Sequence, residues 1–195
     1  MSKRIALLSA VAFSALALTA SVIAPASAED KKMMKSELSG EKTVMVGGAA
    51  MFPSKNIIQN AVNSKDHTTL VAAVKAAGLV ETLEGKGPFT VFAPTNAAFG
   101  KLPAGTVDTL VKPENKATLT KILTYHVVPG RLEASSPTDG KKLKTVEGEE
   151  LTVKHQDGKI WIVDAKGGTS MVTISNVNQS NGVIHVVDTV LMPAS

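Results

Sequence analysis

The segment NGVIHVVDTVLMP, residues 181–193, decides the fold of this chain. From Val183 to Met192, both odd- and even-numbered positions are mainly apolar, so both sides of the strand are apolar. This pattern is typical of a central strand covered on both faces. His185 and Asp188 interrupt this apolar run three positions apart, so they point to opposite faces and need separate hydrogen-bond partners. A strand of this kind predicts a sheet with several further strands beside it.

Further strands are expected before this segment along the chain. Phe89–Ala93 is a short buried strand that Pro94-Thr95 stops. Asp157-Gly158, between two alternating runs, is the strongest hairpin signal. After Leu123 the expected strands are Tyr125–Val128, Leu143–Val146, Leu151–His155, Ile160–Val163, Val172–Ile174 and Val183–Met192.

Helical patterns fill the part of the chain before these strands. A first helix from Ser54, with Ser54 as a possible cap, carries an apolar face at Ile57, Ile58, Ala61 and Val62. A second helix has Thr68 or Thr69 as its cap, a buried stripe from Leu70 to Ala77, and Gly78 as its left-handed C-terminal residue. Shorter helices are expected at 79–83, 96–99, 106–111 and 115–123. Helices first and strands afterwards favour an α+β fold with a largely antiparallel sheet.

Composition limits the function classes. The chain has 195 residues, 44% of them hydrophobic and 19% charged, which suits one globular domain. Because it has no cysteine, disulfides, thiolate metal sites and thiol nucleophiles are excluded. The net charge of +4 and an aromatic content of 4% argue against nucleic acid as a partner.

The N-terminus has the pattern of an export signal. Lys3 and Arg4 precede an apolar stretch from Ile5 to Ala24, and Pro25-Ala26-Ser27-Ala28 supplies a small-residue cleavage site. We predict a signal peptide at 1–28, cleaved after Ala28, and a secreted or periplasmic product without a transmembrane span. The alternative is an uncleaved membrane anchor. Residues 29–53 are expected to form a flexible tether and extended lead-in, followed by a single domain at 54–195.

The residues present no catalytic or cofactor constellation. No two of the histidines at 67, 126, 155 and 185 have the spacing of a helical metal pair, and no nucleophile elbow or phosphate-binding loop occurs. His67 and His155 are expected in solvent, whereas His126 and His185, in apolar runs, are expected in the core with hydrogen-bond partners. The lysines at 141, 142 and 144 predict the exposed face of an edge strand.

Three segments resemble the successive signature segments of the fasciclin (FAS1) domain, in order and in spacing. They are FTVFAPTNAAF at 89–99, YHVVPG at 125–130 and NGVIHVVDTVLMP at 181–193. The resemblance covers about residues 54–193. It implies a wedge of about seven mostly antiparallel strands in two sheets, with several short helices packed on one side. The signature residues with a structural role are Phe92, Pro94, Thr95, Phe99, Asn181, Gly182, His185 and Asp188.

The resemblance also implies a function. Members of the family are extracellular or envelope proteins associated with cell adhesion and are not known as enzymes. The tyrosine-histidine motif linked to adhesion in animal members falls on Tyr125 and His126, which are therefore the candidate partner-binding residues. A second adhesive motif, an aspartate-isoleucine pair, falls on Asn176-Val177, where the carboxylate is missing.

The expected function is therefore a non-catalytic adhesion or surface-interaction module without a cofactor or metal. Surface or matrix proteins, polysaccharides or further copies of the chain are the expected partners. The alternative is a binder of a small ligand or polysaccharide, with a pocket near Tyr125, His126 and the loop at 85–88.

Overall fold

The computed structural model describes residues 42–194. The predicted signal peptide, its cleavage site and most of the predicted tether lie outside the described residues. Within residues 42–194, no helix is both long enough and apolar enough to span a bilayer.

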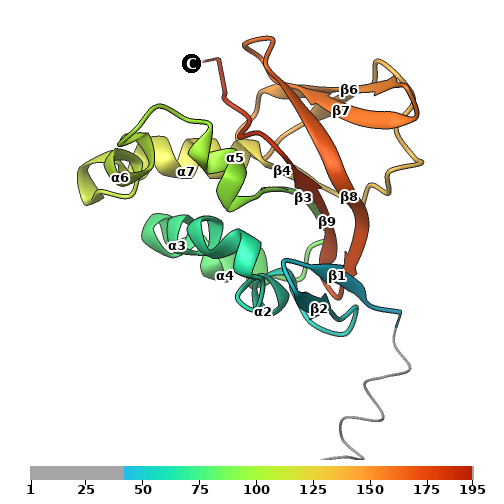
Figure 1. The fold of residues 1–195 in the computed structure, drawn as a ribbon, viewed down its shortest axis with the longest axis horizontal. Coiled ribbons are helices and arrows are strands. Elements are labelled where there is room, and N and C mark those ends of the chain that lie inside the picture. The colour runs from blue at the N-terminus through green and yellow to red at the C-terminus, as the bar shows by residue number, and fades with distance from the viewer. Residues whose placement is uncertain (1–41, 195) are drawn as a thin grey trace, which may run out of the picture. The chain divides into compact units, whose positions relative to one another are not determined.

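Seven strands form the main sheet in the order β4-β3-β9-β8-β7-β6-β5 (Figure 1). Their bounds are β3 Phe89–Pro94, β4 Val127–Pro129, β5 Lys142–Lys144, β6 Glu150–Gln156, β7 Lys159–Val163, β8 Thr169–Gln179 and β9 Gly182–Val187. The neighbours β3 and β9 are parallel, and all other neighbouring pairs of this sheet are antiparallel. The predicted α+β class with a mostly antiparallel sheet is therefore confirmed.

Strand β8 joins two halves of this sheet. Its first residues pair with β7, from Thr169 opposite Val163 to Met171 opposite Trp161, whereas the part from Val172 to Gln179 pairs with β9. Two register shifts interrupt the pairing with β9, and irregularities of this kind bend a strand. The two halves thereby enclose one apolar core that includes Phe92, Tyr125, Leu151, Ile162 and Leu191.

A group of short helices lies beside the half of the sheet that contains β3 and β9 (Figure 1). The helices are α2 Ile57–Ala61, α3 Thr68–Ala77, α4 Val80–Glu84, α5 Asn96–Gly100, α6 Thr106–Leu110 and α7 Lys116–Tyr125, with 3-10 turns at Lys65–His67 and Pro113–Asn115. Their buried side chains form a second and larger core with strands β3 and β9. Gly78 ends α3 at φ +74°, as predicted.

The caps of the first two helices differ from the prediction. Asn56, not Ser54, caps α2 in a capping box with Gln59. Neither threonine caps α3 through its side chain. Instead, the side chain of Asn96 accepts a hydrogen bond from the Thr69 N–H at 3.0 Å, so a residue distant in sequence supplies this cap.

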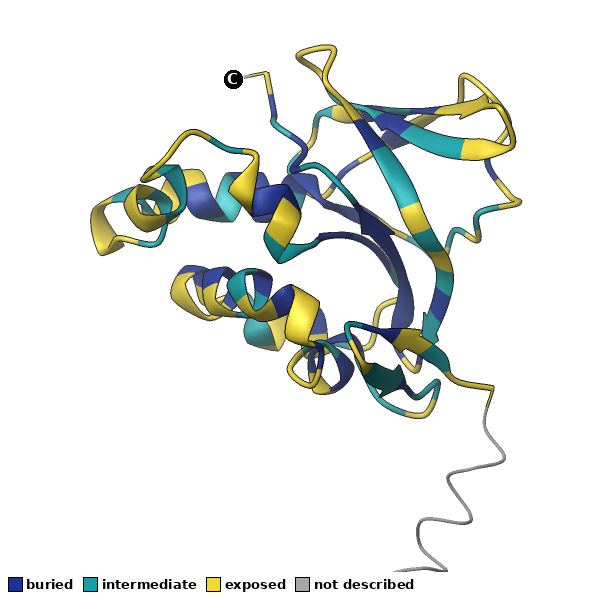
Figure 2. Cartoon of the chain, in the orientation of Figure 1, coloured by how far each residue is buried: buried dark blue, intermediate teal, exposed yellow. Residues whose placement is uncertain are grey.

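The stretch predicted as an extended lead-in forms a hairpin. Strands β1 Val44–Val46 and β2 Ala49–Met51 pair in antiparallel fashion, and Gly47 and Gly48 between them both have positive φ. Val46 and Met51, the last residues of the two strands, are buried in the larger core. Figure 2 colours the hairpin by burial, in the orientation of Figure 1. The hairpin is therefore packed as part of the folded unit.

Three predicted strands have different bounds. Tyr125 is the last residue of α7 and His126 its C-cap, so the strand predicted at 125–128 begins only at Val127. Strand β9 ends at Val187, and β8 extends well beyond the predicted 172–174. The predicted hairpin at Asp157-Gly158 joins β6 and β7, and both of its residues have positive φ.

Candidate functional site

Tyr125 is held inside the protein at the end of α7. Its side chain is 0% exposed, its hydroxyl donates to the Glu150 carbonyl at 3.2 Å, and the same oxygen accepts from the Ala165 N–H at 2.8 Å. Burial raises the pKa of Tyr125 to about 12. The residue therefore ties α7 to β6 and to the loop after β7.

His126 is equally enclosed, with 2% of its surface exposed. Its Nδ1 lies 2.8 Å from the Ile122 carbonyl, which can only accept, so Nδ1 carries the proton. Its Nε2 accepts from the Leu191 N–H at 3.0 Å. Burial lowers the pKa of His126 to about 4, and the imidazole is neutral. The expected core role of His126 is thus what the structure shows.

The burial of these two residues bears on the predicted partner-binding site. Every polar atom of the Tyr125 and His126 side chains is used inside the protein. Neither side chain is exposed on the protein surface, where a macromolecular partner would bind. We therefore treat the pair as positioning residues and look for a binding surface elsewhere.

His185 occupies a comparable place on β9. It is 4% exposed, its Nε2 donates to the Leu132 carbonyl at 2.8 Å, and its Nδ1 accepts from the Asn176 N–H at 3.3 Å. Its ring stacks on Phe92 with the ring centroids 5.8 Å apart. Asn176 has φ +56° and its side chain accepts from the Ala134 N–H. The position of the second adhesive motif is thus a structural bulge in β8.

The Asn181-Gly182 pair fixes the start of β9. The Asn181 side chain accepts from the Ile57 N–H at 3.1 Å and donates to the carbonyls of Leu83 and Gly85. A Cβ on Gly182 would stand 2.1 Å from the Phe89 carbonyl oxygen, closer than any side chain can approach. This pair therefore joins the α2 and α4 helices to the centre of the sheet.

The other signature residues also stabilise the fold. Thr95 follows Pro94, the last residue of β3, and caps α5 by accepting from the Ala98 N–H. Phe99 lies in the larger core. The carboxylate of Asp188 accepts from the Met171 N–H at 2.9 Å. Burial alone would raise the pKa of Asp188, but this hydrogen bond, one from Thr189 and the charge of Lys101 together lower it.

His67 is a residue whose environment the sequence predicted wrongly. It is 3% exposed, not solvated, and it ends the 3-10 turn Lys65–His67 directly before α3. Its Nδ1 lies 2.9 Å from the Ser64 hydroxyl. Among residues 42–194, its Nε2 is the one buried side-chain polar atom that has no hydrogen-bond partner.

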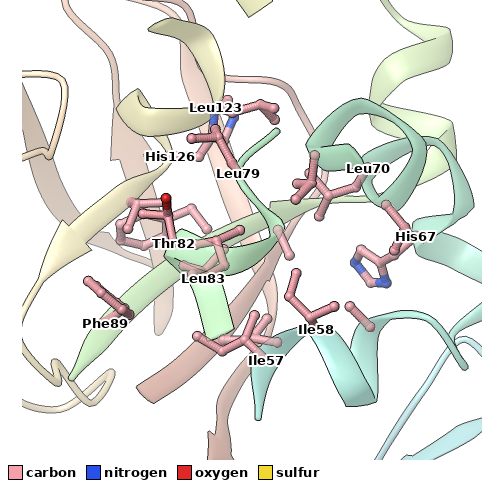
Figure 3. Close-up of a pocket in the computed structure, with 18 of the residues that line it drawn as sticks. Ile57, Ile58, His67, Leu70, Leu79, Thr82, Leu83, Phe89, Leu123 and His126 are labelled. Atoms are coloured by element: carbon pink, nitrogen blue, oxygen red, sulfur yellow. The ribbon is translucent and has the colours of Figure 1, made fainter. Parts of the chain in front are cut away.

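A cavity of about 70 Å³ lies between the helices and the sheet (Figure 3). Its lining is apolar except for His67, Thr82, Thr124 and His126. Thr124 donates to the Thr120 carbonyl, and both nitrogens of His126 are used as described above. Like the pocket predicted for a small ligand, the cavity is lined by His126, and Thr124, Leu83 and Phe89 place it beside Tyr125 and the loop at 85–88, although neither of these belongs to the lining.

The buried histidines do not form a catalytic constellation. His126 and His185 bond only to backbone groups. The contact of His67 with the Ser64 hydroxyl lacks a carboxylate on the other ring nitrogen. Within residues 42–194, no group of three or more His, Asp or Glu side chains could hold a metal ion.

The outer face of β5, β6 and β7 carries a cluster of cations. Alternation places Leu143, Leu151, Val153 and Ile162 in the core, so the residues between them point outward. We name this outer surface the basic face and define it by Lys142, Lys144, Lys154, Lys159 and Trp161. All four lysines are exposed, and Lys154 lies directly opposite the half-buried Trp161.

One carboxylate offsets part of this charge. Glu150 lies opposite Lys144 on the same face and forms an ion pair with Lys142 at 3.2 Å. The prediction of an exposed, lysine-bearing edge strand is confirmed, because β5 is the outermost strand of the sheet. The contribution of Trp161 to this face was missed, although its alternation with Ile160 and Ile162 could have revealed it.

The comparisons with known proteins agree with this fold. The chain is 50% identical over 153 residues to Protein sll1483 of Synechocystis sp., covering 78% of this chain and 82% of that protein. It is 40% identical to Immunogenic protein MPB70 of Mycobacterium bovis over 68% of this chain and 66% of that protein. It is 39% identical to Cell surface glycolipoprotein MPB83 of the same species over 76% of this chain and 64% of that protein. The chain therefore spans about two thirds of the length of each of these mycobacterial relatives.

A solved structure and a family model complete the comparison. A FAS1 domain pair from the insect cell adhesion molecule Fasciclin I superposes with a TM-score of 0.62 at 18% identity, covering 72% of this chain and 52% of that one. This likeness concerns the fold alone. The model of the Fasciclin domain matches residues 65–193, which include all three signature segments, and the chain therefore belongs to the fasciclin domain family.

Proposed function

We propose that this protein is an exported, non-catalytic interaction module of the cell envelope, and that its basic face holds acidic surface polysaccharide. The observation that carries the proposal is the placement of four exposed lysines around Trp161 on one regular sheet surface. The relative named a cell surface glycolipoprotein and the adhesion molecule that shares the fold support a role at the cell surface.

The chemistry of the basic face favours an acidic polymer. Four lysines against one glutamate leave a local excess of positive charge, which attracts a polyanion and orients it during encounter. The indole of Trp161 offers a flat apolar surface with a polar N–H at its edge, and a sugar ring has both an apolar and a polar side. A polymer also contacts many copies of the protein at once, so weak single contacts add up to useful avidity.

The test is binding of the exported protein to an acidic polysaccharide, alginate, with neutral dextran as the comparison. The variant Lys142→Gln/Lys144→Gln/Lys154→Gln should bind alginate roughly tenfold more weakly, since each exposed charge contributes up to about 1 kcal/mol. Affinity for alginate should also fall as salt is raised.

A matched variant controls for net charge. Lys75, Lys86 and Lys112 are exposed on or beside the helices, so Lys75→Gln/Lys86→Gln/Lys112→Gln changes the charge equally while leaving the basic face intact. Equal losses in both triple variants would attribute binding to net charge and contradict the proposed site. If Trp161→Ala bound alginate as native protein does, the indole would not be part of the proposed binding site.

A further inference from the structure

The cavity between helices and sheet is unusual for a protein interior. Interiors are packed at nearly crystalline density, with few voids larger than a water molecule. A void of about 70 Å³ has room for several waters, yet its lining offers them few polar partners. An apolar space of this kind takes an apolar occupant.

A second and independent observation lies at the wall of the same cavity. The His67 ring is one of the side chains that line it (Figure 3), and Nε2 of this ring has no hydrogen-bond partner. The nearby Ala93 backbone on β3 acts to raise the pKa of His67 against the larger effect of burial, but it does not meet Nε2 with hydrogen-bond geometry. A buried polar atom left unpaired costs free energy, and a bound molecule with a suitable polar atom would remove this cost.

We infer that the cavity binds a small or single-chain apolar molecule with one uncharged oxygen, and that this oxygen forms a hydrogen bond with Nε2 of His67. The apolar part fills the space bounded by Ile58, Leu70 and Leu123 (Figure 3). An alcohol serves either tautomer of His67, because a hydroxyl both donates and accepts.

The uncharged lining of the cavity excludes a ligand with a negatively charged end. Burial lowers the pKa of His67, so its ring is neutral near pH 7. Neither lysine nor arginine is among the lining residues. A buried carboxylate would therefore lack a counter-charge, which separates this ligand from the acidic polymer proposed for the basic face.

The cavity also has an exit to solvent. Thr82 and Val146 belong to its lining and are themselves exposed. They come from α4 and from the turn after β5, far apart in the sequence. The cavity therefore lies nearest to solvent between these two segments, which is where a ligand would enter.

The first test compares hexan-1-ol with hexane as probes of the full-length protein, with binding followed by methyl chemical shifts. Native protein should bind both and prefer the alcohol. His67→Leu should weaken hexan-1-ol binding roughly tenfold, which is the value of one hydrogen bond, and leave hexane binding unchanged. The control His155→Leu, at an exposed histidine, should change neither.

The second test fills the cavity. Val71 lines it and is half-buried, whereas Val62 is exposed and lies outside it. Val71→Phe should abolish binding of both probes, and Val62→Phe should preserve it. The inference is overturned if native protein binds neither probe, if Val71→Phe binds as native does, or if His67→Leu keeps the full preference for the alcohol.

Discussion

Gly182 shows how a single position can fix the centre of this fold. It begins β9 directly opposite Phe89 of β3, and a Cβ there would meet three backbone atoms of Phe89 within 3.1 Å. Since these atoms belong to a neighbouring strand and not to a flexible side chain, the strands would have to separate to make room.

We therefore expect Gly182→Ala to lower the free energy of unfolding by about 3 kcal/mol, at the upper end of the cost of overpacking. Urea denaturation measures this loss. Gly100→Ala is the matched control, because Gly100 ends α5 and a Cβ there would meet nothing within 4 Å. A loss at Gly182 no larger than that at Gly100 would contradict the assigned close approach.

Asn96 shows how one helix can stabilise another, because it lies in α5 and caps the start of α3. Its carbonyl oxygen accepts from the Thr69 N–H and its amide donates to the Lys65 carbonyl, so the start of α5 holds the start of α3. An orphan N–H at a helix start is normally satisfied by the residue just before the helix.

Asn96→Ala should destabilise the protein by about 1 kcal/mol, the usual value of a cap. Asn96→Asp keeps the acceptor and adds a negative charge at the N-terminus of α3, which favours the helix dipole. It should therefore lose less stability than the alanine variant. Thermal unfolding of the two variants provides the comparison, and the reverse order would show that the amide donor matters more than the acceptor.

The sequence predicts helices and strands correctly where the residues that determine them are close together along the chain. The strand at 89–93, which the structure extends to Pro94, and the hairpin at Asp157-Gly158 were predicted because a short apolar run and turn residues act over a few positions. Tyr125 and His126 were placed on a strand because the apolar run that follows them hides the end of α7.

The candidate sites depend on contacts between distant segments, so the sequence indicated them only in part. His67 stands among polar neighbours, Lys65 and Asp66, which predicted solvent exposure, yet the fold buries it. The cavity at its side is bounded by segments from β1 to β9 and has no local signature. The lysines of β5 were predicted as exposed, whereas their relation to Trp161 required the strand register.

At the scale of the whole molecule, three buried histidines make stability depend on pH. Burial lowers the pKa of His67, His126 and His185, that of His126 from 6.5 to about 4. With each folded-state pKa below its unfolded value, the unfolded chain takes up protons first as the pH falls. The free energy of unfolding must therefore decrease on acidification below about pH 6.5.

For His126 alone we expect a loss of roughly 2 kcal/mol between pH 7 and pH 5, at about 1.4 kcal/mol for each pKa unit. Urea unfolding at both pH values measures it. His126→Asn should be less stable at pH 7 and should show a flatter pH dependence. His155→Asn, at an exposed position, should leave the slope unchanged, and a steep slope in the His126 variant would assign the effect to other groups.

The parallel pairing of β3 with β9 also determines when the main sheet can form during synthesis of the chain. Of the strands within residues 42–194, the inner strand β9 is synthesised last, and β3 and β8 on its two sides have no partner in that place until it arrives. Such long-range pairing is slow to form. A chain whose residues 182–187 are still on the ribosome, or still crossing a membrane, therefore lacks the strand that joins β3 to β8, and its sheet stays incomplete until those residues can pair.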